Sequence, residues 1–154
     1  MTRFGSAALA LFLILCTGCH EAQDMNGSES PPPGAMSYLG YDDSGRLVVT
    51  GWLFFDIVTI QAPPIPLEFP GTWRLHALVD PAGIGPQNGS GVLAGTFLQA
   101  GGLAVELHPD RADDNVFLVG TLTVGGPAAM RYEGTWQWIT LAGVRAEGKF
   151  LASQ

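Results

Sequence analysis

The side chains that most often carry out enzyme chemistry are few in this sequence, and their spacing groups none of them into a site. The three histidines are His20, His76 and His108, and none has a second ligand at a spacing typical of zinc sites. Ser44 and Ser90 lie in expected turns, without the Gly-x-Ser-x-Gly pattern that presents a nucleophilic serine. No pair of carboxylates is expected within a cleft. We therefore predict a protein that is not an enzyme and has no catalytic residues.

One cluster of oxygen ligands lies between two expected strands. Asp110, Asp113, Asp114 and Asn115 could bind Ca²⁺ weakly, but the spacing and the terminal glutamate of an EF-hand are missing. The same residue types are also typical of Asx turns that cap a hairpin. We favour the turn, and predict no metal site and no cofactor.

A set of aromatic residues on expected strands offers the other candidate site. Such rings could line a pocket for a small apolar ligand. They could equally fill the core, because burying a large apolar side chain contributes about 1.5–3 kcal/mol. Both interpretations stay open at this point. The candidate ligand-binding residues are Trp73, Phe97, Tyr132, Trp136, Trp138 and Phe150.

Many of these aromatic residues belong to a repeated pattern, apolar-x-Gly-x-apolar. Because successive strand residues point to opposite faces, the glycine and the two apolar residues that flank it share one face. Glycine inside a strand costs roughly 0.5–1 kcal/mol relative to alanine, so its repetition indicates a geometric role. A small barrel supplies that role, because its strands coil sharply and an aromatic side chain can fill the space above each bend. The six copies are centred on Gly51, Gly71, Gly95, Gly120, Gly134 and Gly148.

Short connections join the expected strands into an antiparallel meander. Seven strands are expected, and residues 38–41 would add an eighth. A proline-rich connection follows at 61–70, and a flexible loop tip is expected at 86–91. We predict an all-β fold: a single antiparallel up-and-down β-barrel of seven to eight strands over residues 37–154.

The strand around Trp52 and Phe54 is apolar on both of its faces. This pattern could mean a strand that is covered on both sides, a contact between copies, or a face turned toward lipid. The covered strand is the interpretation we favour.

The stretches Gly71-Thr72-Trp73 and Gly134-Thr135-Trp136 carry a family resemblance. Gly-x-Trp on a barrel strand resembles the signature of the calycins, the group of lipocalins, avidins and their lipocalin-like bacterial relatives. The later lipocalin motifs and the polar ring with which avidins hold biotin are not found in this sequence. The resemblance implies a lipocalin/avidin-like barrel and leaves the ligand class open.

Residues 1–18 have the features of a signal peptide: Arg3 is followed by an apolar run, 7–15, that is short for a membrane span. The run ends in Cys16-Thr17-Gly18-Cys19, which resembles the lipobox of bacterial lipoproteins, with Cys16 at the place where leucine is usual. The resemblance implies that Cys19 is lipidated and becomes the N-terminus. Plain secretion, with cleavage near Ala22, is the alternative.

Residues 19–36 are polar and rich in turn formers, and we expect them to be a disordered tether. The formal net charge of −7, without a basic cluster, argues against nucleic-acid binding. Acyl chains would therefore hold the protein to a membrane. His20, where an aspartate would signal inner-membrane retention, favours the outer membrane of a bacterial cell envelope by resemblance to lipoprotein sorting.

Together these features predict a membrane-anchored lipoprotein whose non-catalytic barrel is an envelope-associated binding or interaction module. The alternative is a lipocalin-like carrier that holds a small apolar ligand in the barrel interior. The sequence does not identify a protein partner.

Overall fold

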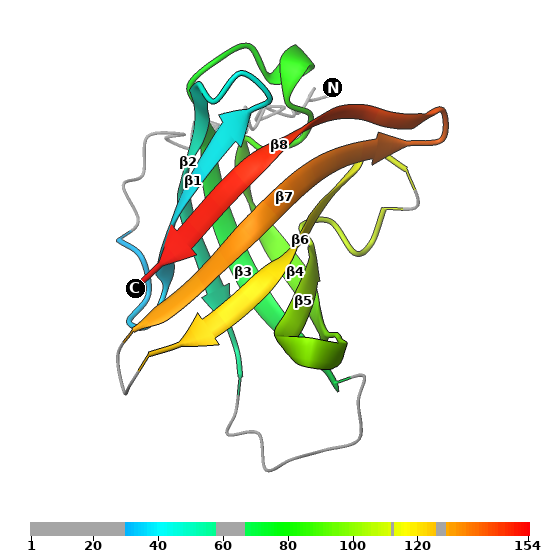
Figure 1. Cartoon of the computed structure of the whole chain (residues 1–154). Coiled ribbons are helices and arrows are strands. Elements are labelled where there is room, and N and C mark those ends of the chain that lie inside the picture. The colour runs from blue at the N-terminus through cyan, green and yellow to red at the C-terminus, as the bar shows by residue number, and fades with distance from the viewer. Residues whose placement is uncertain (1–29, 58–66, 112, 126–128) are drawn as a thin grey trace, which may run out of the picture.

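The computed structural model describes residues 30–57, 67–111, 113–125 and 129–154. Eight antiparallel strands form a closed barrel in which each strand pairs with the next and β8 pairs with β1 (Figure 1). The prediction of an all-β up-and-down barrel is thereby confirmed. The strands are β1 Met36–Asp42, β2 Leu47–Phe55, β3 Leu67–Ala77, β4 Gly89–Phe97, β5 Gly102–Glu106, β6 Asn115–Val124, β7 Met130–Thr140 and β8 Gly143–Ser153, with short 3-10 helices at Pro81–Gly83 and Gln99–Gly101.

β1 closes the barrel. It was expected to be short, yet it has seven residues and pairs along most of its length with both β2 and β8. The strand begins at Met36, whose side chain is buried. Because each strand is paired on both sides within residues 36–153, we expect the chain from Ser30 onward to fold on its own.

The repeated glycines lie where neighbouring strands approach too closely for a side chain. In five copies, a Cβ built on the glycine would lie 2.0–2.2 Å from a carbonyl oxygen of the adjacent strand. At Gly95, the same Cβ would lie 2.1 Å from Cζ of the Phe69 ring. The glycines therefore allow the barrel to coil tightly, as the pattern predicts.

Aromatic rings fill the middle of the barrel. The centroid of Tyr132 lies 4.6 Å from that of Phe150 and 5.9 Å from that of Phe55. Tyr38 stacks on Phe150 from the other side, with centroids 5.9 Å apart. The Tyr132 hydroxyl shares its one proton between carbonyl oxygens of β5 and β6, and burial raises the pKa of Tyr132 above its ordinary value. The interior is thus a packed core with satisfied polar groups.

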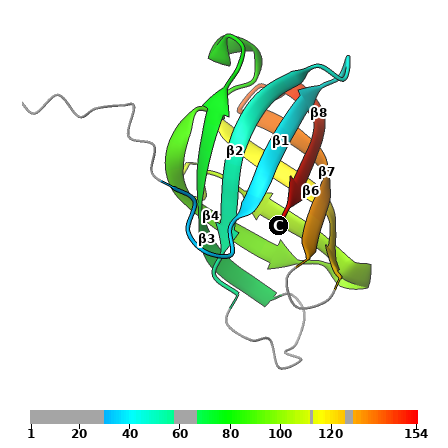
Figure 2. The same ribbon diagram turned by 90° about the vertical axis from the view of Figure 1, so that its left-hand side faces the viewer.

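The two ends of the barrel differ in the connections that they carry. We call the end where β1 begins the entry end; β2, β4 and β6 end there, and the C-terminus lies there too (Figure 2). There, Gln154 Nε2 donates to the carbonyl oxygen of Gly34. We call the opposite end, with the connections after β1, β3, β5 and β7, the far end.

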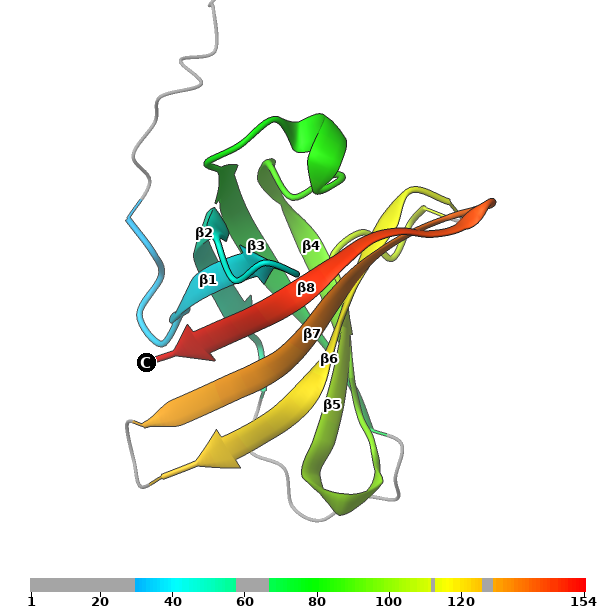
Figure 3. The same cartoon turned by 45° about the horizontal axis from the view of Figure 1, so that its top comes forward.

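Two strand ends extend past the packed core. The hairpin of β7 and β8 projects at the far end, and Leu141 in its turn is 85% exposed (Figure 3). At the entry end, Val124 is 65% exposed. It is the last residue of β6, beyond the point where the facing strands can cover it.

Candidate functional site

The structure divides the six candidate ligand-binding aromatics into two groups. Trp73, Tyr132, Trp136 and Phe150 are at most 3% exposed and belong to the packed core. Phe97 and Trp138 are half-buried and lie near opposite ends of the barrel. The six side chains therefore do not surround one shared cavity.

The two Gly-x-Trp copies make the same contacts four strands apart. Trp73 on β3 lies opposite Gly91 of β4, and its Nε1 donates to the carbonyl oxygen of Leu107, just after β5, at 2.6 Å. Trp136 on β7 lies opposite Gly148 of β8, and its Nε1 donates to the carbonyl oxygen of Tyr41 on β1 at 2.9 Å. Each indole thus lies across a glycine of the adjacent strand and forms a hydrogen bond with the chain beyond that strand. This role is structural.

Trp138 is part of the closure of the far end. Its Nε1 donates to Asp114 Oδ1 at 2.7 Å, and the Arg145 guanidinium carbon lies 5.3 Å from its ring centroid. A Cβ on Gly85 would lie 2.5 Å from the indole, so only glycine fits beneath the ring. Trp138 therefore holds the β3–β4 connection against the barrel.

That connection, residues 78–88, is a plug. Ile84 and Gln87 are almost completely buried. Gln87 Oε1 accepts a hydrogen bond from the Tyr38 hydroxyl at 3.3 Å, and Gln87 Nε2 donates to the carbonyl oxygen of Ile84. His108 Nε2 lies 2.9 Å from the carbonyl oxygen of Pro86. The expectation of a flexible loop tip at 86–91 is wrong, because these contacts fix its first part and residues 89–91 belong to β4.

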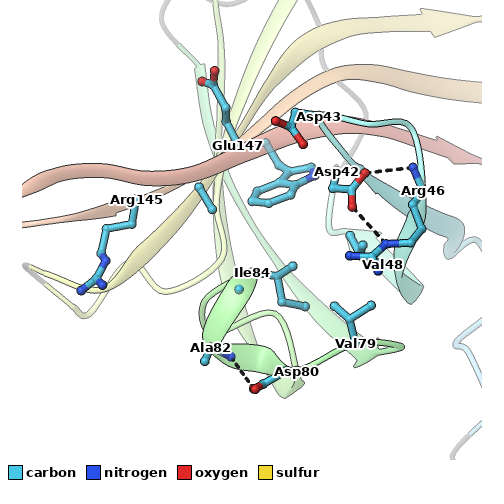
Figure 4. Close-up of a pocket in the computed structure, with 13 residues that line it drawn as sticks. Asp42, Asp43, Arg46, Val48, Val79, Asp80, Ala82, Ile84, Arg145 and Glu147 are labelled. Atoms are coloured by element: carbon cyan, nitrogen blue, oxygen red, sulfur yellow. Dashed lines mark hydrogen bonds and ion pairs between the residues drawn. The ribbon is translucent and has the colours of Figure 1, made fainter.

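Above the plug lies an open cup of about 850 Å³. Apolar side chains from β2, β7, β8 and the 78–88 connection share its wall with charged side chains from the turns, β1 and β8 (Figure 4). Figure 4 shows Asp42 joined to Arg46 and Asp80 joined to Ala82, with Arg145 apart from both pairs. The cup is lined mainly by Asp42, Asp43, Arg46, Val48, Val79, Asp80, Ile84, Trp136, Arg145 and Glu147.

Several carboxylates of the cup are engaged by the protein itself. Asp42 Oδ1 accepts hydrogen bonds from Ser44 N, Ser44 Oγ and Arg46 N. These bonds hold the pKa of Asp42 below its usual value, and the bond from the Ser44 hydroxyl has the largest effect. Asp80 Oδ1 accepts from Ala82 N, and Glu147 Oε2 accepts from Gln137 Nε2 at 3.1 Å. These interactions hold turns and strands, so the cup offers a binding surface without a free acid and base pair among these three groups.

A second hollow, of about 580 Å³, opens at the entry end. Its size falls in the range of small-molecule pockets, and its lining is largely apolar. Phe97, from the predicted aromatic set, belongs to it. The apolar side chains of this hollow are Phe54, Phe55, Ile57, Phe97, Leu122, Val124 and Met130.

The outer face of β2 is partly covered, as the favoured interpretation of its sequence predicts. Trp52 and Phe54 are half-buried, and Pro32 of the arriving chain lines the same shallow groove as both of them. A Cβ on Gly34 would lie 3.8 Å from the Phe54 ring. The arriving segment therefore packs on the barrel and is the covering element for Phe54.

The Asp and Asn cluster after β5 is engaged in hydrogen bonds and an ion pair. Asn115 Oδ1 accepts from His108 N at 3.0 Å, and Asp114 pairs with Arg111 at 3.6 Å. Among the described residues, no group of three or more His, Cys, Asp or Glu side chains could hold a metal ion. Within the same ranges, no helix has the length and apolar character needed to cross a membrane. Asn115 thus joins the two sides of the β5–β6 connection, by a contact across seven residues that is not an Asx turn.

Fold and sites together define a closed eight-stranded barrel with a packed interior and an open hollow at each end. Comparison of the chain with protein-family models, curated proteins and solved structures finds no match. Its function is therefore argued from the geometry of the two ends.

Proposed function

We propose that this protein is a lipid-anchored, non-catalytic barrel that acts as a binding or interaction module of the bacterial cell envelope. The observation that carries the proposal is the placement of the ends: the described chain leads into β1 at the entry end, while the cup lies at the far end. An anchor at one end would present the cup to the surrounding compartment. The lipobox resemblance around Cys19 supplies the anchor.

The composition of the cup supports binding to a polar partner. Its wall alternates charged groups with apolar side chains, and Asp43 and Arg145 stand near its rim (Figure 4). The plug beneath is fixed by buried contacts of Ile84 and Gln87, so the shape of the cup is set before a partner arrives. A preformed surface on a rigid barrel suits recognition.

Replacing Cys19 with alanine should move the protein from the membrane fraction to the soluble fraction or leave it as an uncleaved precursor, because no thiol would remain at the lipobox position that is acylated. Fractionation of cells and metabolic labelling with a fatty acid would measure this. Cys16→Ala is the matched control and should leave labelling unchanged. Membrane fractionation and labelling that persist in Cys19→Ala would contradict the anchor. On a density gradient, the native chain should follow the outer membrane.

A second candidate function, a carrier of a small apolar ligand, is favoured by the hollow at the entry end. The core rings occupy the middle of the barrel, so the ligand would lie at this mouth instead of in the centre. Phe97, Leu122 and Met130 would then contact the ligand. The residues to test are therefore those around the mouth, and not the buried aromatic residues of the core.

The carrier function predicts saturable binding of a fluorescent fatty acid by the domain from Ser30 to Gln154. Leu122→Trp should fill the hollow and weaken binding by about tenfold or more, because the larger side chain would occupy the space that the acyl chain of the ligand needs. Val119→Trp, on the outer face of the same strand and 44% exposed, is the control. Absence of saturable binding, or equal affinity of the two variants with unchanged thermal unfolding, would contradict this function.

A further inference from the structure

We propose that the entry end of the barrel rests on the surface of the bilayer that holds the anchor, with its apolar rim in the headgroup region. The partner in this contact is the lipid surface itself. The inference rests on the proposed lipid anchor and goes beyond it, because an anchor on a flexible tether does not by itself orient a domain.

Apolar side chains surround the mouth at this end, although three exposed apolar residues, Leu78, Leu141 and Val144, lie at the far end. At the entry end itself, Leu98, which follows β4, is 40% exposed, and Val124, the last residue of β6, is 65% exposed. Ile57, Leu122 and Met130 are half-buried around the same opening. Apolar residues around one mouth form a surface that water solvates poorly and that a lipid interface can take up.

The connections at the two ends of the barrel differ in their number of charged residues. Between the strands, the entry-end connections carry one charged residue, Asp56, while the far-end connections carry seven. Five of these seven are acidic, so the far end would be repelled from anionic headgroups and the entry end would not. The seven are Asp43, Arg46, Asp80, Asp110, Arg111, Asp113 and Asp114.

The length and the arrival point of the tether allow the contact. A flexible chain of the length that separates Cys19 from Ser30 would span on the order of 20 Å, short enough to keep the domain near the headgroups. Segment 30–35, which leads into β1 at the entry end, is fixed to the barrel through Gly34 and Gln154. The apolar mouth is therefore the part of the domain that the tether brings nearest to lipid.

A thiol-specific fluorophore can measure this orientation in the full, anchored chain. In the mature lipoprotein Cys16 is removed and Cys19 is acylated, so an introduced cysteine is the only free thiol. We would label Val124→Cys at the entry end and Leu141→Cys at the far end, both at exposed positions. The chains would be placed in vesicles of phosphatidylethanolamine and phosphatidylglycerol that contain spin-labelled phospholipid as a quencher. Quenching at residue 124 should exceed quenching at residue 141 by about threefold or more.

A charge placed on the rim should weaken the contact. Leu98→Asp should roughly halve the quenching of the label at residue 124, because burial of a carboxylate in the interface is unfavourable. Val144→Asp, at the far end and 53% exposed, should leave it unchanged. Equal quenching at 124 and 141 in chains that float with the vesicles would overturn the docking while leaving the anchor intact. Chains that fail to float would instead overturn the anchor.

Discussion

Replacing Gly134 with valine should lower the free energy of unfolding by about 3 kcal/mol or more, because the added atoms have no space. A Cβ at this position would lie 2.1 Å from the carbonyl oxygen of Val119 and 2.5 Å from Cα of Gly120. Both contacts are with backbone of the neighbouring strand, which cannot move without breaking the pairing of β6 with β7. Chemical denaturation followed by tryptophan fluorescence would measure the loss.

Thr135→Val is the matched control for this substitution. Thr135 is the next residue on β7 and is exposed on the outer face of the barrel. Valine suits an exposed strand position, so we expect a change within about 0.5 kcal/mol. Equal losses in the Gly134 and Thr135 variants would contradict the assignment of the glycines to the close approach of strands.

Trp136→Ala should be the second severe change, with a loss of about 3–5 kcal/mol. The side chain is completely buried, and its removal would open a cavity above Gly148. The carbonyl oxygen of Tyr41 would also lose the hydrogen bond from Nε1. Because that bond reaches β1, the effect should include weaker closure of the barrel, visible as faster amide hydrogen exchange in β1 and β8.

Trp52→Ala provides the comparison for Trp136. Trp52 is half-buried on the outer face of β2, so its removal opens no enclosed cavity, and we expect a loss of roughly 1 kcal/mol. Amide exchange in β8 should not change in this variant. If Trp52→Ala were as costly as Trp136→Ala, the division into a packed interior and an outer face would be wrong.

Much of the fold follows from side-chain alternation along single strands. Around Gly134, the period of two places Tyr132 and Trp136 on one face and Glu133 and Thr135 on the other, and the structure shows the first pair buried and the second exposed. Short polar connections leave few ways to join such strands except as an antiparallel meander. The barrel could therefore be predicted from local pattern.

The candidate site could be predicted only in part. That Ile84 and Gln87 fold inward depends on partners such as Tyr38, 49 residues away from Gln87, which no local pattern reveals. Whether the six aromatics enclose a space or fill it depends on how tightly the strands coil, which involves the whole barrel. A proline and an amide in succession, as at Pro86-Gln87, are also typical of exposed loops.

The sequence predicted Phe97 as a candidate contact for an apolar ligand. It did not show which other residues lie around Phe97, or at which end of the barrel. Ile57, Leu122 and Met130 come from three different strands or their ends. Their convergence follows from barrel closure, and only the closed structure shows that the entry of the chain lies at the same end.

The pairing of β1 with β8 has a consequence for the order in which the molecule forms. These strands lie at the two ends of the folded chain, and the bond between Trp136 and Tyr41 spans 95 residues. Contacts of such long range form late, since the intervening chain must first be ordered. The first strand would keep one unpaired edge until the last strand arrives. A chain that crosses a membrane from its N-terminus would therefore stay open, and available to chaperones, until its translocation is complete.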